Sequence, residues 1–246
     1  MTQRLCLTAS NLILNLNILL TCHRFLIHLK MRNTLVLIIV FCLASPLAKT
    51  QSVFIPETSF GIKLGGNLST VSFDPRVEQD LYSGFVGGLV FKHISQKSLG
   101  IQVELNYLQA GWSENLESPN YYSRRLNYIQ LPTMTHINFG KKKTRFFINL
   151  GSYFSYLVSD IETTDLIADE EEKIYYGQDI DHQLDFGFCF GLGLSRNTSI
   201  GIIQISSRVN YGFISLFDYS AETPFDKSSN QIAEFTLSYL LMRRSK

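Results

Sequence analysis

The sequence predicts an all-β fold, an eight-stranded antiparallel up-and-down transmembrane β-barrel with short periplasmic turns and long extracellular loops. Three observations lead to this prediction. After residue 52 the chain has no apolar run of the roughly 18 residues that a membrane-spanning helix needs. Eight segments instead alternate apolar and polar residues with the period of two that is typical of strands. The connections between them are alternately short and long, as in an up-and-down barrel.

Each expected strand is long enough to cross a bilayer at a tilt, which takes about 9–11 residues. The expected strands are 58–69, 81–93, 98–111, 124–138, 144–157, 182–195, 200–213 and 230–242. The short connections are His93–Ser98, Asn138–Thr144 and Arg196–Ser199, and the long ones are Thr70–Asp80, Trp112–Ser123, Ser159–Asp181 and Phe213–Ser229. Because the number of strands is even, both ends of the barrel should lie on the periplasmic side, with the short turns.

Alternation is clearest in the third, fifth, sixth, seventh and eighth segments. In the third, the apolar face holds Leu99, Ile101, Val103, Leu105 and Tyr107, and the polar face holds Gly100, Gln102, Glu104 and Asn106. Successive side chains of a strand point to opposite sides, so this spacing gives two unlike faces. In the sixth, leucines and phenylalanines from Leu184 to Leu194 alternate with Asp185, Cys189 and glycines.

Alternation alone does not decide which face is outside, because a soluble sandwich or a lipocalin-like barrel turns its apolar faces inward. Three features favour apolar faces outward. The polar faces are rich in glycine, which suits a narrow lumen, and they carry charges of both signs. The apolar faces carry aromatic residues near the strand ends, as in the girdle of a membrane barrel. These aromatic residues are Phe60, Tyr107, Phe139, Phe146, Tyr156, Tyr211 and Tyr239.

Composition agrees with a protein that has much of its surface in lipid. Charged residues make up 17% of the chain, whereas about a quarter is usual in a soluble domain, and aromatic residues make up 13%. The formal net charge of +1 gives no reason to expect a nucleic acid partner.

The N-terminal part predicts export from the cytoplasm. Residues 31–50 combine Arg32, the apolar run Leu35–Leu43 and small residues up to Ala48, which is the pattern of a signal peptide. We expect residues 1–30 to be a spurious N-terminal extension, with translation beginning at Met31; the alternative is an N-terminal membrane anchor. Residues 51–57 would then be a short periplasmic lead-in, 58–242 the barrel and 243–246 a C-terminal tail. The expected location is the outer membrane of a Gram-negative bacterium, after signal-peptide cleavage.

The run Asn127–Pro132 (NYIQLP) resembles the mark of PorT-like outer-membrane β-barrel proteins, with Tyr128, Gln130 and Pro132 as the motif residues. The segments Phe60–Asn67, Gly187–Gly193 and Arg208–Gly212 are similar to other strands of that family. The resemblance covers about residues 58–242 and implies a small outer-membrane barrel. One member is linked to a secretion apparatus, a role that short strand motifs do not transfer. The chain ends in RRSK rather than an aromatic residue, so Tyr239 would supply the terminal aromatic residue of the insertion signal.

The candidate site is a network of charges on the polar faces, formed by Lys63, Glu104, Arg145, Asp185 and Arg208. Buried charges must be paired, and an eight-stranded barrel has a lumen just wide enough to be filled by side chains. We therefore expect a structural network; the alternative is a gated polar path. Pro132 has no backbone N–H and should interrupt regular strand pairing.

The sequence gives little support for a catalytic site or a metal site. The acidic segment Asp160–Glu172 offers oxygen ligands for a divalent cation but lacks the spacing of a calcium loop, so a solvated loop is the simpler interpretation. His93, His136 and His182 are scattered, and no G-x-S-x-G or H-E-x-x-H motif occurs. Cys189 is the only cysteine after residue 42, and it is expected to pack inside a strand. We expect no catalytic residue, no cofactor and no metal ion.

The sequence thus favours a non-enzymatic outer-membrane barrel with a structural, adhesion or secretion-complex accessory role. A narrow small-solute channel and a loop-based outer-membrane enzyme are the alternatives. The expected partners are outer-membrane lipid, the barrel-insertion machinery and proteins of the envelope or of a secretion complex.

Overall fold

The computed structural model describes residues 55–114, 116, 120–140, 143–165, 176–218 and 225–244. All of these residues belong to one compact unit, Phe54–Lys246. The predicted extension 1–30, the signal peptide 31–50, the start of the lead-in and the last two residues of the tail lie outside the described residues. In the described part, no helix has the length and apolar character needed to cross a membrane.

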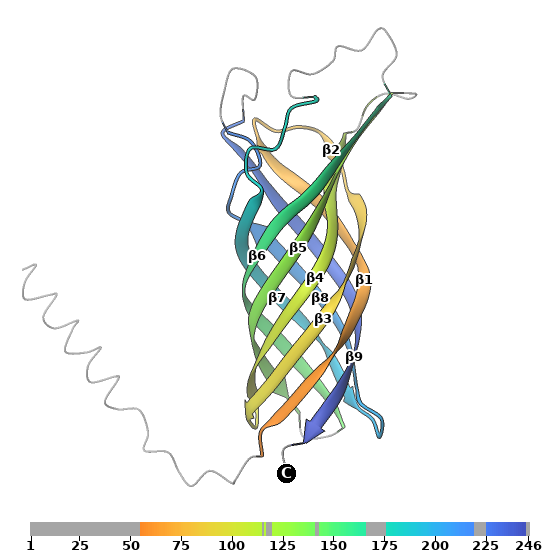
Figure 1. Ribbon diagram of the computed structural model, residues 1–246, viewed down its shortest axis with the longest axis vertical. Coiled ribbons are helices and arrows are strands. Elements are labelled where there is room, and N and C mark those ends of the chain that lie inside the picture. The colour runs from red at the N-terminus through yellow and green to blue at the C-terminus, as the bar shows by residue number, and fades with distance from the viewer. Residues whose placement is uncertain are drawn as a thin grey trace, which may run out of the picture. The chain divides into compact units, whose positions relative to one another are not determined.

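Eight long strands form a closed antiparallel ring (Figure 1). They are β1 (Glu57–Asp74), β3 (Tyr82–Gln96), β4 (Leu99–Glu114), β5 (Tyr121–Phe139), β6 (Thr144–Asp165), β7 (Leu184–Asn197), β8 (Ile202–Gly212) and β9 (Lys227–Arg244). Each long strand pairs with the next one along the chain, and β4 pairs with both β3 and β5. The predicted up-and-down barrel is confirmed. The short strand β2 (Gln79–Asp80), which was not predicted, pairs with the end of β4.

The ring closes where β1 pairs with β9. The pairing runs from Glu57↔Arg244 to Asp74↔Lys227, along the full length of β1. Closure leaves no strand edge inside the lipid, where an unpaired backbone group costs several kcal/mol. Both ends of the barrel lie on the side of the short turns, as predicted (Figure 1).

The short turns are built from residues suited to tight reversals. Lys97 and Ser98 join β3 to β4. After β5 the chain turns at Gly140, whose φ of 112° is open to glycine and strained for other residues. Between β7 and β8, the backbone N–H of Thr198 donates to the carbonyl of Gly201 at 2.8 Å, and the Thr198 hydroxyl accepts from the N–H of Gly201 at 3.2 Å.

On the opposite side the strands extend into segments that the sequence predicted as long connections. β1 continues to Asp74, β6 continues to Asp165, and β9 begins at Lys227. The register of β5 and β6 shifts between Asn127 and Tyr128, so the alternation of β6 changes near Val158. Because the bulge breaks the alternation of apolar and polar residues, a period-two pattern in the sequence does not detect the last part of β6 as strand. Since β7 begins only at Leu184, the upper part of β6 rises beyond the closed ring together with β5.

The apolar faces point outward, as predicted. Large exposed side chains cover every long strand, including Phe60, Leu105, Leu150, Leu192, Ile205 and Leu237. The lumen holds the polar residues of the same strands. It is narrow, because glycines of β7 lie against aromatic rings of β6. A Cβ atom at Gly193 would lie 2.6 Å from the Phe147 ring, and one at Gly187 would lie 2.7 Å from the Tyr153 ring.

This orientation predicts that a charge on the outer face is tolerated only above the membrane. Leu237 is 56% exposed in the middle of β9, and Ile161 is 44% exposed on the part of β6 beyond the closed ring. We expect Leu237→Arg to lower the free energy of unfolding in lipid vesicles by about 2–4 kcal/mol, and Ile161→Arg to change it by less than about 1 kcal/mol. Urea titration followed by tryptophan fluorescence measures both. Equal effects of the two substitutions would contradict the orientation.

Candidate functional site

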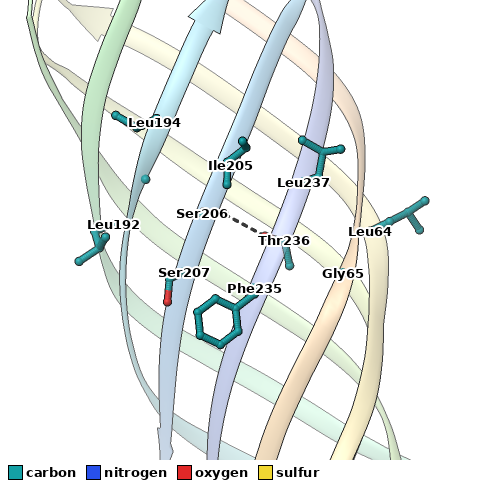
Figure 2. A pocket seen from close by; sticks show the side chains of 11 residues that line it. Leu64, Gly65, Leu192, Leu194, Ile205, Ser206, Ser207, Phe235, Thr236 and Leu237 are labelled. Atoms are coloured by element: carbon teal, nitrogen blue, oxygen red, sulfur yellow. Dashed lines mark hydrogen bonds between the residues drawn. The ribbon is translucent and has the colours of Figure 1, made fainter.

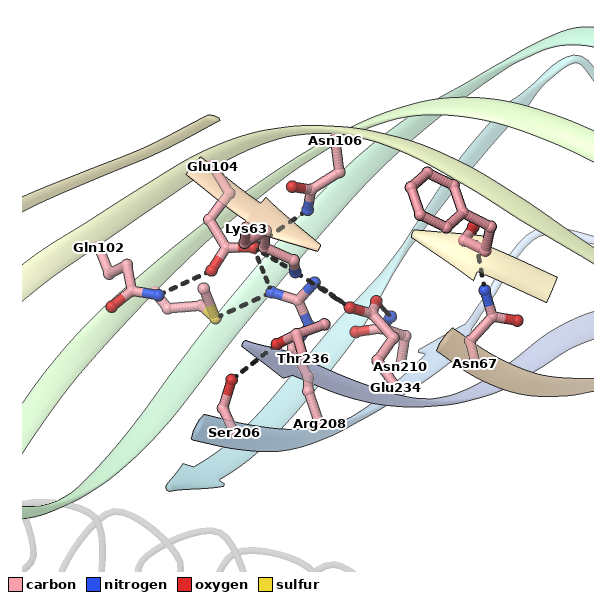
Figure 3. Close-up of polar contacts among 12 residues, drawn as sticks. Lys63, Asn67, Gln102, Glu104, Asn106, Ser206, Arg208, Asn210, Glu234 and Thr236 are labelled. Atoms are coloured by element: carbon pink, nitrogen blue, oxygen red, sulfur yellow. Dashed lines mark hydrogen bonds and ion pairs between the residues drawn. The ribbon is translucent and has the colours of Figure 1, made fainter. Parts of the chain in front are cut away.

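Four charged side chains meet in the middle of the lumen (Figure 3). Lys63 of β1 lies 2.8 Å from Glu104 of β4 and 3.1 Å from Glu234 of β9, measured from Nζ to Oε2. Arg208 of β8 lies 2.9 Å from the same oxygen of Glu104 and 2.6 Å from that of Glu234. Each cation therefore contacts both carboxylates. We call these four residues the central cluster.

The central cluster spans the whole lumen. In the ring of eight strands, β4 and β8 lie opposite each other, so the contact between Glu104 and Arg208 joins the two sides. All four side chains are buried, and two positive charges balance two negative ones. Gln102 and Asn106 donate hydrogen bonds to Glu104, and Asn210 donates to Glu234. Such pairing is what allows charges to remain inside a narrow barrel.

Three of the five predicted lumen charges belong to this cluster, namely Lys63, Glu104 and Arg208. Arg145 and Asp185 lie elsewhere in the lumen. Glu234, which forms ion pairs with both cations, was missed. It occupies the same face of β9 as Thr236 and Ser238, so extending the alternation of that strand by one step toward its start identifies it.

Asp185 belongs to a second polar layer, on the extracellular side of the central cluster. The hydroxyl of Tyr153 and the side-chain amide of Asn230 each donate to Asp185 at 3.1 Å. The amide of Asn230, on β9, also donates to the hydroxyl of Tyr128, on β5, at 3.1 Å. Strands β5 and β9 are opposite in the ring, so this layer crosses the lumen as well.

The three motif residues of β5 all point into the lumen and are buried. Tyr128 takes part in the second layer, and Gln130 has neither a donor nor an acceptor partner for its amide in the described structure. At Pro132 the pairing of β4 with β5 is interrupted, because no partners are matched between Val103↔Thr133 and Asn106↔Gln130. The missing N–H of proline explains this gap.

An apolar cluster fills the extracellular end of the lumen. Trp112, which the sequence placed in a loop, lies in β4 and is fully buried. Its ring packs edge-on against Phe73 at 5.3 Å and against Phe217 at 6.5 Å between centroids. Tyr122 stacks on Tyr176 at 4.0 Å. The remaining buried members are Val71, Val86, Leu108, Ala110, Leu126, Tyr128, Leu157, Leu216, Phe225 and Ile232.

The other candidate groups do not assemble into a reactive site. His93 lies near Thr58, His136 lies between Asn138 and Asn149, and His182 lies 2.9 Å from Asp218 on the loop side. Among the described residues, no three His, Cys, Asp or Glu side chains are placed to hold a metal ion.

The predicted acidic loop is partly a strand. Asp160 and Asp165 belong to β6, where Asp160 forms an ion pair with Arg124, and residues 166–175 lie outside the described residues. Cys189 is buried in the lumen beside Met134 and Tyr153.

A shallow hollow of about 580 Å³ lies on the outer face of β1, β7, β8 and β9 (Figure 2). Leu64, Leu192, Leu194, Ile205, Phe235 and Leu237 form its walls. The small residues Gly65, Gly193 and Ser207 also line it, as do Ser206 and Thr236, whose hydroxyls share a hydrogen bond of 2.8 Å. Because this face is apolar, the hollow suits a lipid chain rather than a polar substrate.

The chain is similar to a known protein family. A family model described as outer membrane protein beta-barrel domain matches residues 51–218. No curated protein matches the chain at a significant level.

Several solved structures are similar at low identity. OprG from Pseudomonas aeruginosa has 9% identity and a TM-score of 0.47, with 79% of this chain and 99% of that chain covered. Ail of Yersinia pestis has 13% identity and a TM-score of 0.40, with 75% and 99% covered. Neisserial surface protein A has 11% identity and a TM-score of 0.40, with 73% and 96% covered.

The central cluster predicts a large effect of removing one cation. We expect Arg208→Ala to lower the free energy of unfolding by about 3–5 kcal/mol, because two buried carboxylates are left with one cation. Adding Glu234→Gln to Arg208→Ala restores the charge balance and should recover part of the loss. The measurement is urea unfolding in vesicles, together with the temperature at which the folded, faster-migrating gel band disappears.

Arg196→Ala serves as the control, because Arg196 is exposed near the end of β7. This substitution should leave both readouts nearly unchanged. If Arg208→Ala behaved like Arg196→Ala, the paired cluster would not be a main source of stability.

Proposed function

Since the chain belongs to the outer membrane protein beta-barrel domain family, we propose that it is a non-enzymatic barrel with a closed lumen that acts through its extracellular end. The barrel lies in the outer membrane of a Gram-negative bacterium. Its role is structural, adhesive or accessory to a secretion complex. The lumen supports the barrel, and the part above the membrane meets the partner.

One observation carries the proposal: side chains cross the lumen at three successive levels. Nearest the extracellular side, Asn230 reaches Tyr128 of the opposite strand. In the middle, Arg208 reaches Glu104. Nearest the periplasm, the Nζ atom of Lys92, on β3, donates to Gln204, on β8, at 2.6 Å.

These contacts weigh against the alternative of a small-solute channel. A solute on its way through the lumen would have to separate the ion pairs of the central cluster and then displace the aromatic rings around Trp112. Eight-stranded barrels generally have lumens filled by side chains, whereas aqueous channels are found in barrels with many more strands.

The extracellular end offers a surface for a partner. The ends of β4, β5 and β6 pair with one another beyond the part of the ring that β7 closes, and β2 adds to β4. Tyr121, Val158 and Ile161 are exposed there. These three side chains are available to contact a partner outside the membrane. Partner binding is therefore the use of this end that its surface supports best.

We also propose that the protein is a PorT-like barrel. The motif Tyr128, Gln130 and Pro132 supports a PorT-like barrel, and a role beside a secretion complex is consistent with that resemblance. We further propose that a signal peptide is removed before insertion and that the barrel-insertion machinery assembles the protein. A loop-based enzyme is disfavoured, because the histidines of the described residues do not form one site: His93 is on the outer face of β3, His136 is buried in the lumen and His182 lies on the loop side.

A closed lumen predicts the absence of steady ion conductance. Purified protein in a planar lipid bilayer should give no stable current step in potassium chloride, with protein-free bilayers as the control. Reproducible unit steps proportional to the amount of inserted protein would overturn the closed-lumen assignment and favour the channel.

If the extracellular end binds a partner, the binding should depend on the exposed apolar side chains of that end. Envelope proteins that co-purify with the wild-type barrel in mild detergent should be lost from the double variant Val158→Ser/Ile161→Ser. The matched control is Leu184→Ser, because Leu184 is exposed at the start of β7, outside the raised part of β5 and β6. Identical sets of co-purified proteins in all three preparations would count against this surface.

A further inference from the structure

A second group of cations lies in the lumen at the periplasmic end. Lys92 of β3 is only 4% exposed. Its Nζ atom donates to the neutral side chain of Gln204, and no carboxylate of the described residues lies within ion-pair distance of it. Lys63, in the central cluster, instead contacts two carboxylates. The molecule thus contains one buried lysine that is neutralised and one that is not.

Arg145 adds a second positive charge beside Lys92. The strand register places Arg145 of β6 opposite Ser195 of β7, and Ser195 opposite Gln204 of β8, the residue that Lys92 contacts. Arg145 is half-buried, and its Nε atom is buried without a hydrogen-bond partner. Among the described residues, no carboxylate pairs with its guanidinium group.

The surroundings of these two cations do not balance their charge. None of the buried side chains around them carries a negative charge: Gln204 contacts Lys92, Ser195 is paired in the strand register with Arg145 and Gln204, and His136 lies against Asn138 and Asn149. Glu57 begins β1 at the same end of the barrel, but it forms no ion pair with Lys92 or Arg145. Even with Glu57 counted, the end of the lumen keeps a net positive charge. Buried charge without a counter-ion is unfavourable, so this arrangement favours binding of an anion.

We propose that Lys92 and Arg145 form a binding site for a phosphate group at the periplasmic mouth of the lumen. Lysine supplies a compact charge with three donors, and the planar fork of arginine suits two oxygens of one phosphate. Gln204 and Ser195 add neutral hydrogen-bonding groups. The phosphate could come from inorganic phosphate in the periplasm or from the headgroup of a phospholipid in the inner leaflet.

The height of the site in the membrane agrees with either source. Arg145 is the second residue of β6, at the periplasmic end of that strand. Phe139 and Phe146 lie on the outer face at the same level, are exposed, and pack 6.0 Å apart between centroids. Aromatic residues on the outer face of a barrel mark the interface where lipid headgroups begin. The two cations therefore lie close to the phosphates of the inner leaflet.

Two measurements on the full-length mature protein test the site and separate the sources. The first is calorimetric titration with inorganic phosphate in a phosphate-free maltoside detergent. The second is native mass spectrometry after exchange into nanodiscs that contain phosphatidylglycerol in an excess of an uncharged glycolipid. Both use the wild type, Lys92→Gln, Arg145→Gln and the control Lys97→Gln, which removes an exposed cation from the neighbouring β3–β4 turn.

We expect the wild type and Lys97→Gln to bind equally, and Lys92→Gln and Arg145→Gln to bind about tenfold more weakly or not at all, since each loses a charged hydrogen-bonding partner. Binding of inorganic phosphate identifies a soluble anion as the ligand. Retention of phosphatidylglycerol alone identifies a lipid headgroup. If no phosphate source bound the wild type, or if all four proteins bound equally, the proposed site would be wrong. The gel mobility of the folded form confirms that each variant is assembled.

Discussion

The fold depends on the rule that every backbone N–H and C=O inside a lipid bilayer needs a partner within the protein. The chain meets this rule by pairing β1 with β9 along their whole length, so that eight long strands leave no edge. Closure at eight strands sets the width of the lumen, and the width decides what can lie inside. Side chains that point inward meet side chains from the opposite wall, and those that point outward meet lipid.

The contents of the lumen follow from this geometry. The rings of Phe147 and Tyr153 occupy the space that side chains at the glycines of β7 would take. Polar contacts between opposite strands cross the rest of the lumen. Charges are stable there when their number is balanced, as in the central cluster, or when a ligand balances them, as we propose for Lys92 and Arg145. A lumen filled in this way supports the wall and leaves interaction with other molecules to the two ends of the barrel.

The sequence predicts the ring and the two faces well, because strand alternation is a local property. Lys63, Glu104 and Arg208 could be assigned to the lumen from the alternation of their own strands. Their grouping could not be read in the same way, since it depends on which residues of opposite strands reach the same height. Asp185 has the right face but lies in another layer, and Glu234 lies one step beyond the alternating residues of β9 that the pattern used. The upper part of β6 was missed because the bulge near Val158 breaks the period of two.

Contacts between lipid acyl chains and individual side chains can be measured directly, and they test whether the apolar faces meet lipid while the lumen is packed with side chains. Methyl-labelled protein in lipid nanodiscs allows nuclear Overhauser effects to be recorded between acyl chains and individual methyl groups. The account predicts contacts from acyl chains to Leu150, Leu192 and Ile205, which are exposed on the outer wall, and none to Val86 and Val90, which are buried in the lumen. Acyl-chain contacts to Val86 and Val90, with none to Leu150, Leu192 and Ile205, would contradict it.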